Sequence, residues 1–171
     1  MQFSKTAKLE AIVSADKSRG AITHIYLDVE QADNPRLIAT DGHVMAIVPV
    51  QATVEEGGYV PVPALKAARK VKGKGDGILA LNGTASLPTG ESWPREDASL
   101  RYPAWRQVVP GADRDGSMKI SLNADLLHRL ADALGSEAVV LELIPAEPLA
   151  PIRVTVAGSP NVGVIMPIRV K

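Results

Sequence analysis

The chain has 171 residues, which corresponds to one domain or slightly more. It contains no cysteine, so a disulfide scaffold and a cysteine-based zinc or iron–sulfur site are excluded. Basic and acidic side chains number 19 each; this zero net charge argues against a globally basic nucleic-acid binder but leaves room for a local basic face. Apolar runs are far shorter than the ~18–20 residues of a membrane span, and the N-terminal residues lack the features of a signal peptide. We therefore expect a cytoplasmic protein.

The first part of the chain predicts one helix followed by strands. Apolar residues at helical spacing predict a helix over residues 5–17. Three strands are expected after it, over residues 22–29, 37–40 and 44–50. The last two flank Asp41-Gly42-His43, a tight connection in which the Asp-Gly pair favours a positive φ.

A second unit begins with an expected strand over residues 59–62 and a helix over residues 63–72, where Pro63 suits the first helical position. Apolar residues share one side of this helix. The segment also carries five cations and no acid, namely Lys66, Arg69, Lys70, Lys72 and Lys74. Weaker strands are expected over residues 78–81, 84–87 and 99–102.

A third unit has the clearest helix. An expected strand over residues 118–122 leads to Asn123, a good N-cap, and Gly135 ends the helix. Three more strands are expected over residues 139–144, 152–156 and 162–170. The order strand, helix, three strands therefore repeats at about 1–50, 59–108 and 118–170, which predicts an α+β fold of stacked units with antiparallel sheets.

No segment has the pattern of an enzyme active site or a metal site. The three histidines stand outside every ligand spacing of the known zinc motifs. A metal site or a small hydrolase built on Asp41 and His43 is the alternative that these residues leave open. The glycine-rich stretch 73–77 resembles a phosphate loop but follows a helix instead of opening one. We expect no catalytic residue, no metal and no cofactor.

The one-sided cationic helix predicts contact with phosphates. Such a face binds DNA electrostatically, without reading bases, and so without sequence preference. Lys5 and Lys8 add positive charge around the first expected helix. In the third helix, Arg129 is outweighed by Asp125 and Asp132.

Three stretches resemble motifs of the bacterial DNA sliding clamp family, the beta subunit of DNA polymerase III. Residues 39–46, ATDGHVMA, are similar to the family's strand–turn–strand segment ATDGHRLA, with Val44 where the family commonly has arginine. Residues 102–110, YPAWRQVVP, resemble FPDYRRVLP, which closes the family's middle domain. Residues 164–170, VIMPIRV, resemble the terminal VVMPMRL, here followed by Lys171.

The resemblance implies a miniature clamp. Residues 1–111 are similar to a complete middle domain of two half-domains, about 1–56 and 57–111. Residues 112–117 would be a linker, and residues 118–171 a single half-domain similar to the second half of the last domain. Three half-domains per chain, in a family whose rings contain twelve, imply a homo-oligomeric ring of four chains.

The resemblance also implies a function without chemistry: a ring that encircles double-stranded DNA and raises the processivity of a polymerase. Helices of the family line the ring, so the expected DNA-facing residues are Lys5, Lys8, Lys66, Arg69, Lys70, Lys72, Lys74 and Arg129. A groove of the family takes peptides of the replicative polymerase and the clamp loader. Its expected walls are Thr40, Gly42, His43, Val44 and Met45 on one side and Val164, Met166, Pro167, Ile168, Arg169 and Val170 on the other, with Pro110 at the junction.

Beside the hydrolase built on Asp41 and His43, one other interpretation remains open at this point. The protein could be a clamp-like adaptor or decoy that binds replication proteins without encircling DNA, and the net acidic third helix is its best support. The place of action would be the cytoplasm, at the nucleoid, and the short plan is compatible with a cellular, phage or mobile-element gene.

Overall fold

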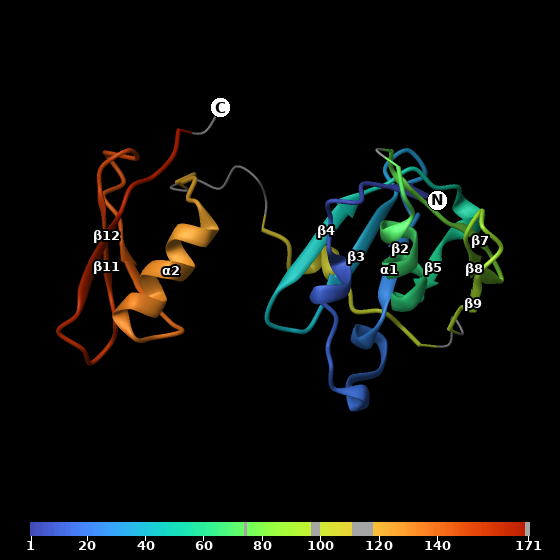
Figure 1. The fold of residues 1–171 in the computed structure, drawn as a ribbon, viewed down its shortest axis with the longest axis horizontal. Helices are drawn as coiled ribbons and strands as arrows, with labels where there is room; N and C mark the ends of the chain where they lie inside the picture. Colours follow the sequence, from blue (N-terminus) through green and yellow to red (C-terminus); the bar gives the residue numbers. More distant parts are fainter. Residues whose placement is uncertain (74, 97–99, 111–117, 170–171) are drawn as a thin grey trace. The chain divides into compact units, whose positions relative to one another are not determined.

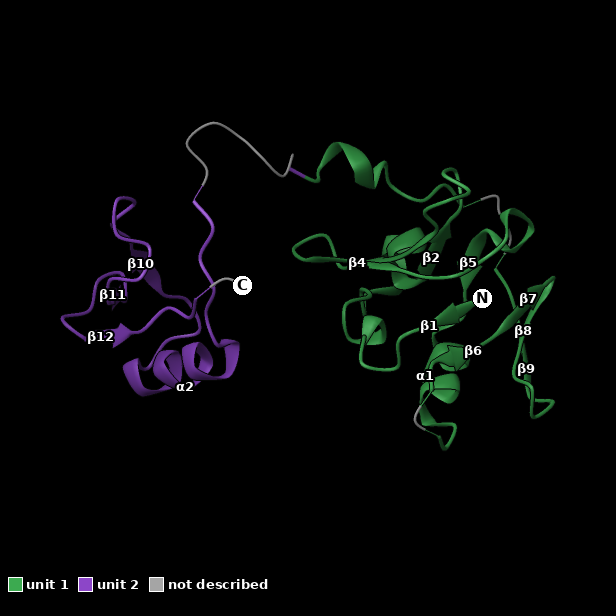
Figure 2. Ribbon diagram, turned by 90° about the horizontal axis from the view of Figure 1, so that it is seen from above, with its two compact units in different colours: residues 1–109 green, residues 110–171 purple. Residues whose placement is uncertain are grey.

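The computed structural model describes residues 1–73, 75–96, 100–110 and 118–169 (Figure 1). The chain divides into two compact units, unit 1 over Met1–Val109 and unit 2 over Pro110–Lys171 (Figure 2). Among the described residues, no helix has both the length and the apolarity that crossing a membrane requires.

Unit 1 is built around a four-stranded antiparallel sheet in the order β4-β3-β2-β5. Its strands are β2 (Ile25–Asp28), β3 (Arg36–Thr40), β4 (Met45–Pro49) and β5 (Gly58–Val60). A short strand, β1 (Gln2–Phe3), pairs antiparallel with β6 (Gly77–Ile78). A second antiparallel sheet has the order β7-β8-β9, with β7 at Ala80–Asn82, β8 at Thr84–Ser86 and β9 at Ser92–Pro94.

The helix α1 (Val62–Lys70) lies on one face of the four-stranded sheet (Figure 1). Ala64, Leu65 and Ala68 of this helix are fully buried in a core that also holds Leu37 and Ala39 of β3. Ile38 lies between these two residues of β3, and its side chain points to the opposite face because side chains alternate along a strand. There it packs with Tyr59, Tyr102 and Trp105. The segment around the 3₁₀ turn η4 (Trp105–Gln107) therefore covers the second face of the sheet.

Unit 2 packs one helix on one antiparallel sheet. The helix α2 (Ala124–Leu134) begins at Asn123, whose side-chain oxygen accepts hydrogen bonds from the backbone N–H groups of Asp125 and Leu126. It ends at Gly135, which adopts a positive φ of 76°. The sheet has the order β10-β11-β12, over Val140–Glu142, Ile152–Thr155 and Val162–Ile165. These features confirm the helix predicted over the third unit.

The helix predicted over residues 5–17 is wrong. The structure has only the 3₁₀ turn η1 (Leu9–Ala11) in this span, followed by the 3₁₀ segment η2 (Lys17–Thr23). Side-chain oxygens compete for the backbone here: Ser14 Oγ accepts from the N–H of Asp16, and Asp16 Oδ1 accepts from the N–H of Ser18. Such local bonds offer the chain an alternative to a helix, so the apolar spacing alone did not decide the conformation.

Several expected strands also differ from the structure. Residues 100–102 are not a strand, and β9 takes the role of the third strand of its sheet. Residues 118–122 make a single bridge, from Ser121 to Ile168, and β12 ends at Ile165, well before the expected end at residue 170. Proline at 167 cannot donate to a ladder, which limits the last strand. Lys74, Ser99, residues 111–117, Val170 and Lys171 lie outside the described residues.

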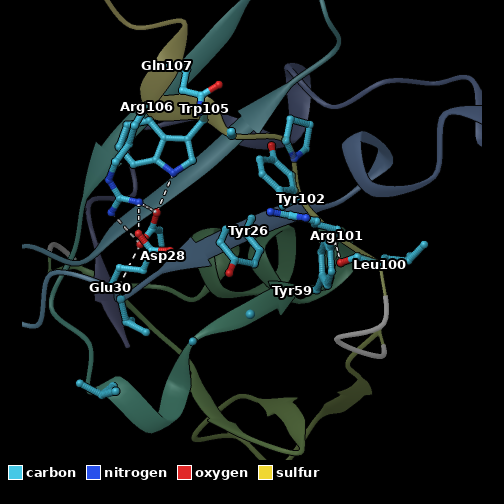
Figure 3. A pocket seen from close by; sticks show the side chains of 16 residues that line it. Tyr26, Asp28, Glu30, Tyr59, Leu100, Arg101, Tyr102, Trp105, Arg106 and Gln107 are labelled. Atoms are coloured by element: carbon cyan, nitrogen blue, oxygen red, sulfur yellow. Dashed lines mark hydrogen bonds and ion pairs between the residues drawn. The ribbon is translucent and has the colours of Figure 1, made fainter.

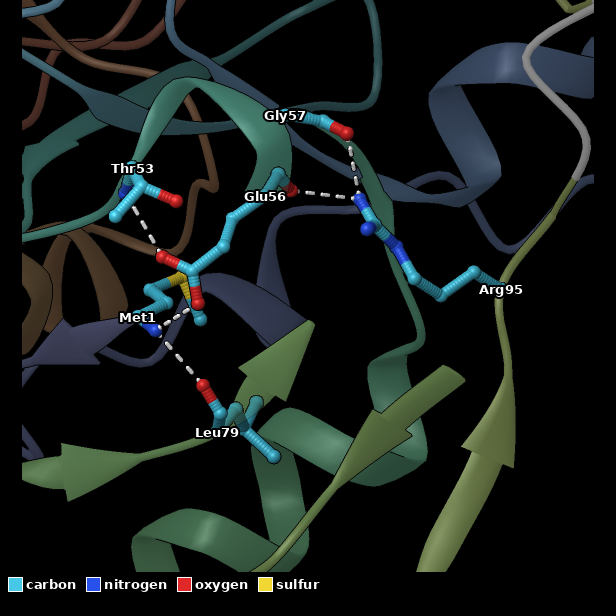
Figure 4. A network of polar contacts seen from close by, with 6 residues as sticks. All are labelled: Met1, Thr53, Glu56, Gly57, Leu79 and Arg95. Atoms are coloured by element: carbon cyan, nitrogen blue, oxygen red, sulfur yellow. Dashed lines mark hydrogen bonds and ion pairs between the residues drawn. The ribbon is translucent and has the colours of Figure 1, made fainter. Parts of the chain in front are cut away.

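A polar network ties the strands of unit 1 together around the 3₁₀ turn η3 (Val54–Glu56) (Figure 4). Glu56 accepts from the backbone N–H of Thr53 at 2.8 Å and forms an ion pair with the amino group of Met1. The Arg95 side chain follows β9 and donates to the backbone carbonyls of Glu56, Gly57 and Tyr59 at 2.8–2.9 Å. Burial lowers the pKa of Arg95, and the three carbonyl oxygens accept hydrogen bonds from its half-buried guanidinium.

Candidate functional site

The turn between β3 and β4 is held in one shape by its own side chains. The Asp41 carboxylate accepts from the backbone N–H groups of His43 at 2.8 Å and Val44 at 2.9 Å. These hydrogen bonds hold the pKa of Asp41 below its usual range, because they favour the charged carboxylate. Thr40 Oγ1 donates to the carbonyl of Val44 at 2.6 Å and accepts from the N–H of Gly42 at 3.0 Å. We call residues 40–45 the hairpin surface.

The hairpin surface presents exposed side chains on a fixed backbone. His43 and Val44 are exposed and Met45 is half-buried. Gly42 has a φ of 91°, and a Cβ at this position would collide with the Arg19 side chain, which donates to the carbonyl of Asp41. The five residues predicted as one wall of a peptide groove therefore lie together on one turn of unit 1.

Unit 2 carries a row of exposed apolar side chains along β12 and the residues after it. Val164 is 61% exposed and Met166 is 58% exposed, while Ile165 between them is buried under α2. We call this row, Val162, Val164, Met166 and Ile168, the apolar strip. Exposed apolar residues in a continuous row mark interaction surfaces more often than isolated ones do. Of the other residues predicted for the second groove wall, Pro167 is half-buried and Arg169 is exposed; Pro110, predicted at the junction, is exposed as well.

Three lysines form an exposed cationic face on and after α1. Lys66, Lys70 and Lys72 are exposed, whereas the apolar side of the helix faces the core. Lys66, Arg69 and Lys70 line a hollow of about 330 Å³ together with Glu10. The arrangement agrees with the predicted division of this helix into an apolar side and a cationic side.

Arg69 and Lys5 differ from these lysines because they hold the unit together. Arg69 forms an ion pair with Glu10 and donates through Nε to the carbonyl of Lys5 at 3.0 Å. The Lys5 ammonium donates to the carbonyl of Val71 at 3.0 Å, at the end of α1. These bonds fasten α1 to the N-terminal segment, so the two cations are committed to contacts inside unit 1.

The remaining predicted cations are Lys8 and Arg129, both exposed. Arg129 lies on α2 with Asp125 and Asp132, and His128 stands 3.6 Å from Asp132. The exposed side of α2 is therefore mixed in charge, unlike that of α1.

Unit 1 also contains an aromatic groove that the sequence did not predict (Figure 3). It encloses about 830 Å³ between the 100–107 segment and the strands β2 and β5. Tyr26 and Tyr102 stack with ring centroids 4.9 Å apart, and Tyr59 stands at a steep angle to Tyr26 at 5.5 Å. The Tyr59 hydroxyl donates to the carbonyl of Leu100 at 2.7 Å.

One wall of the aromatic groove is a buried carboxylate. Asp28 accepts from Trp105 Nε1 at 2.6 Å and from Arg106 at 2.7–2.9 Å, and Arg106 also pairs with Glu30. Burial raises the pKa of Asp28, but the hydrogen bonds from Arg106, the Glu30 N–H and Trp105 outweigh burial, so the pKa lies below its ordinary value. No local pattern signals this site, because Asp28 and Trp105 lie 77 residues apart.

The arrangement of the described residues does not support a metal site or a hydrolase built on Asp41 and His43. Among the described residues, no three His, Asp or Glu side chains come close enough to hold a metal ion. The Asp41 carboxylate is engaged by two amides of its own turn.

Comparisons with known proteins agree with the motif resemblance at the level of the fold. No family model and no curated protein matches the chain. The DNA polymerase III subunit beta of Borrelia burgdorferi, solved in complex with a natural product, superposes with a TM-score of 0.63 at 13% identity over 97% of this chain. A sliding clamp (DNA polymerase III subunit beta) of Bartonella birtlesii bound to griselimycin gives a TM-score of 0.49 at 20% identity, covering 99% of this chain and 66% of that chain.

The chain spans 47% of the length of the Borrelia protein. The match covers 97% of this chain, which contains several antiparallel sheets and few helices. A likeness of this extent at low identity defines an architecture. The chain therefore has the fold of the DNA polymerase III beta sliding clamps.

Proposed function

We propose that the protein is a DNA sliding clamp that tethers replication proteins to double-stranded DNA and performs no chemistry. The observation that carries the proposal is the clamp fold over 97% of the chain, joined to a helix that presents lysines outward. The chain assembles into a closed ring of four copies, each contributing three half-domains.

The contact with DNA rests on Lys66, Lys70 and Lys72, with Lys8, Lys74 and Arg129 in support. A lysine ammonium is a mobile point charge, so it attracts phosphates without fixing a register along the duplex. Such contact suits a protein that slides. Arg69 and Lys5 act indirectly, because they hold α1 on the N-terminal segment.

The contact with polymerase and clamp-loader peptides rests on the hairpin surface and the apolar strip. Met45 and Met166 adapt their shape to different apolar anchors, and His43 and Arg169 add polar contacts. Each surface contributes to binding, so His43→Ala and Met166→Ala each weaken the capture of the replicative polymerase.

The second candidate is an adaptor or decoy that binds replication proteins without encircling DNA. It is favoured by α2, whose exposed side carries Asp125 and Asp132 against the single Arg129. An acidic side on one of the helices weakens a continuous cationic lining.

Retention on DNA separates the two candidates. We expect the protein, loaded with the clamp loader of its host, to remain on closed circular DNA at high salt and to leave after linearisation. Lys66→Glu/Lys70→Glu lowers the affinity for DNA and flattens its salt dependence, because two phosphate contacts are lost.

The matched control is Arg101→Glu, since Arg101 is exposed on the 100–107 segment, on the face of the sheet opposite α1. This reversal leaves DNA affinity unchanged. Equal retention on circular and linear DNA, or equal effects of both reversals, would contradict the clamp and favour the adaptor.

A further inference from the structure

The two halves of unit 1 join through one kind of junction used twice. The first strand of each half pairs antiparallel with the second strand of the other half: β1 with β6, and β5 with β2. One side of the helix α1 packs at the same junction, against η1 of the first half and β6 of the second, and Ala64 on this side is fully buried. The junction therefore has approximate twofold symmetry and closes four strand edges at once.

Unit 2 repeats the same order of elements but its corresponding edges are open. Its first strand, around Ser121, is bridged on one side to Ile168, just as Gln2 of β1 is bridged to Gln51. On its other side no strand pairs within the described residues of unit 2, and β10 is likewise an edge strand. Unpaired edges of this kind are templates for another strand.

The helices α1 and α2 can be compared position by position from their N-caps, and this comparison also indicates that unit 2 lacks a partner. Ala64 is the third residue of α1 and is 0% exposed, whereas the third residue of α2, Leu126, is 46% exposed. The next positions, Leu65 and Leu127, face the core in both helices. Leu126 is thus exposed where its counterpart in unit 1 is fully buried in a core that both halves share.

We infer that two copies of unit 2 dock on each other and form a composite domain. The 118–122 segment of one copy pairs antiparallel with β10 of the second copy, and the 118–122 segment of the second copy pairs with β10 of the first. The contact is therefore isologous. The partner is a second copy of unit 2. In unit 1, the strand edges that correspond to the two open edges of unit 2 pair with each other, so two copies of unit 2 offer each other the edges that each one lacks. The inference deepens the proposed ring, for which it supplies one of the interfaces.

A cysteine cross-link tests the strand pairing directly, because the natural chain has no cysteine. In unit 1, Gln2 stands opposite Ile78, and the corresponding positions are Ser121 and the exposed Val140. Within one copy these two residues are three strand spacings apart, about 14 Å at ~4.8 Å per strand, too far for a disulfide. The full chain with Ser121→Cys and Val140→Cys is expected to give a disulfide-linked dimer, and each single variant much less.

Native mass measurement tests the helix contact. Leu126→Lys is expected to halve the mass of the assembled protein. The matched control is Leu149→Lys, since Leu149 is 45% exposed in the loop between β10 and β11, and it leaves the mass unchanged. Circular dichroism of Leu126→Lys checks that α2 persists.

The outcomes separate this interface from the ring. A cross-linked dimer that never exceeds two copies supports the interface and contradicts the ring of four. A ring of four that forms no cross-link and ignores Leu126→Lys overturns the interface and leaves the clamp standing. A monomer at micromolar concentration overturns both.

Discussion

Asp28 is the residue on which the covering of the second sheet face depends. Its carboxylate accepts hydrogen bonds from the side chains of Trp105 and Arg106, and these bonds hold the 100–107 segment on β2. Asp28→Asn removes the charge from a buried, hydrogen-bonded group, and we expect the free energy of unfolding of unit 1 to fall by about 1–3 kcal/mol at neutral pH. Denaturant titration measures the change.

The pH dependence of this effect has a definite sign. The folded pKa of Asp28 lies below the ordinary 3.8, so its contribution is present above that pH and is lost as the pH falls through the folded pKa. The gap between wild type and Asp28→Asn therefore closes in acid. Asp33→Asn, in the exposed turn between β2 and β3, serves as control and shows no such gap.

The three tyrosines form one cluster of ring contacts in unit 1. Burial raises the pKa of Tyr26, Tyr59 and Tyr102, and the carboxylates of Asp28 and Glu30 raise that of Tyr26 further. Alkaline titration of tyrosinate absorbance is expected to show all three tyrosines titrating at higher pH in the folded protein than in denaturant. A raised folded pKa stabilises the fold below the unfolded value, so stability falls as the pH rises through the folded pKa values. A tyrosine of ordinary pKa would contradict the cluster.

Among the elements, the β3–β4 hairpin turn depends on Gly42. Gly42→Ala places a Cβ at a φ of 91° and against Arg19, so we expect a loss of about 1–2 kcal/mol from the backbone and an additional loss from the collision. Gly83→Ala is the control, because Gly83 has a φ of 81° and open space around it. Added to Gly42→Ala, the substitution Arg19→Ala removes the collision, so the loss of stability should then fall to that of Gly83→Ala. Thermal unfolding measures all four proteins.

Elements with local signals could be predicted from the sequence, and those that depend on distant partners could not. The helix α2 has its N-cap Asn123, its apolar stripe and its C-terminal Gly135 within one segment, so the prediction holds. The helix expected over residues 5–17 has the stripe without a cap, and Ser14 and Asp16 redirect the backbone. The hairpin turn was likewise visible in Asp41-Gly42. The aromatic groove was not, since its parts come from opposite ends of unit 1.

At the scale of the whole molecule, one module occurs in two situations. Inside unit 1 it shares a core with its neighbouring half, and α1 loses all access to solvent at Ala64, Leu65 and Ala68. In unit 2 the same module buries Ala131, Ile152, Val154 and Ile165 on its own. Small cores of this kind are close to the lower limit of independent stability, so we expect unit 2 to unfold more easily than unit 1.

The aromatic residues of the chain all belong to unit 1, and the sequence from Pro110 onward has none. Intrinsic fluorescence from Trp93 and Trp105 therefore reports on unit 1 alone, whereas helical ellipticity reports on both units. Val154→Ala, which removes two methyl groups from the core of unit 2, should leave the fluorescence melt unchanged and lower the first part of the ellipticity melt. A single shared transition would show that the two units unfold together. The division of the aromatic side chains thus gives the protein a built-in optical label that distinguishes one unit from the other without any added dye.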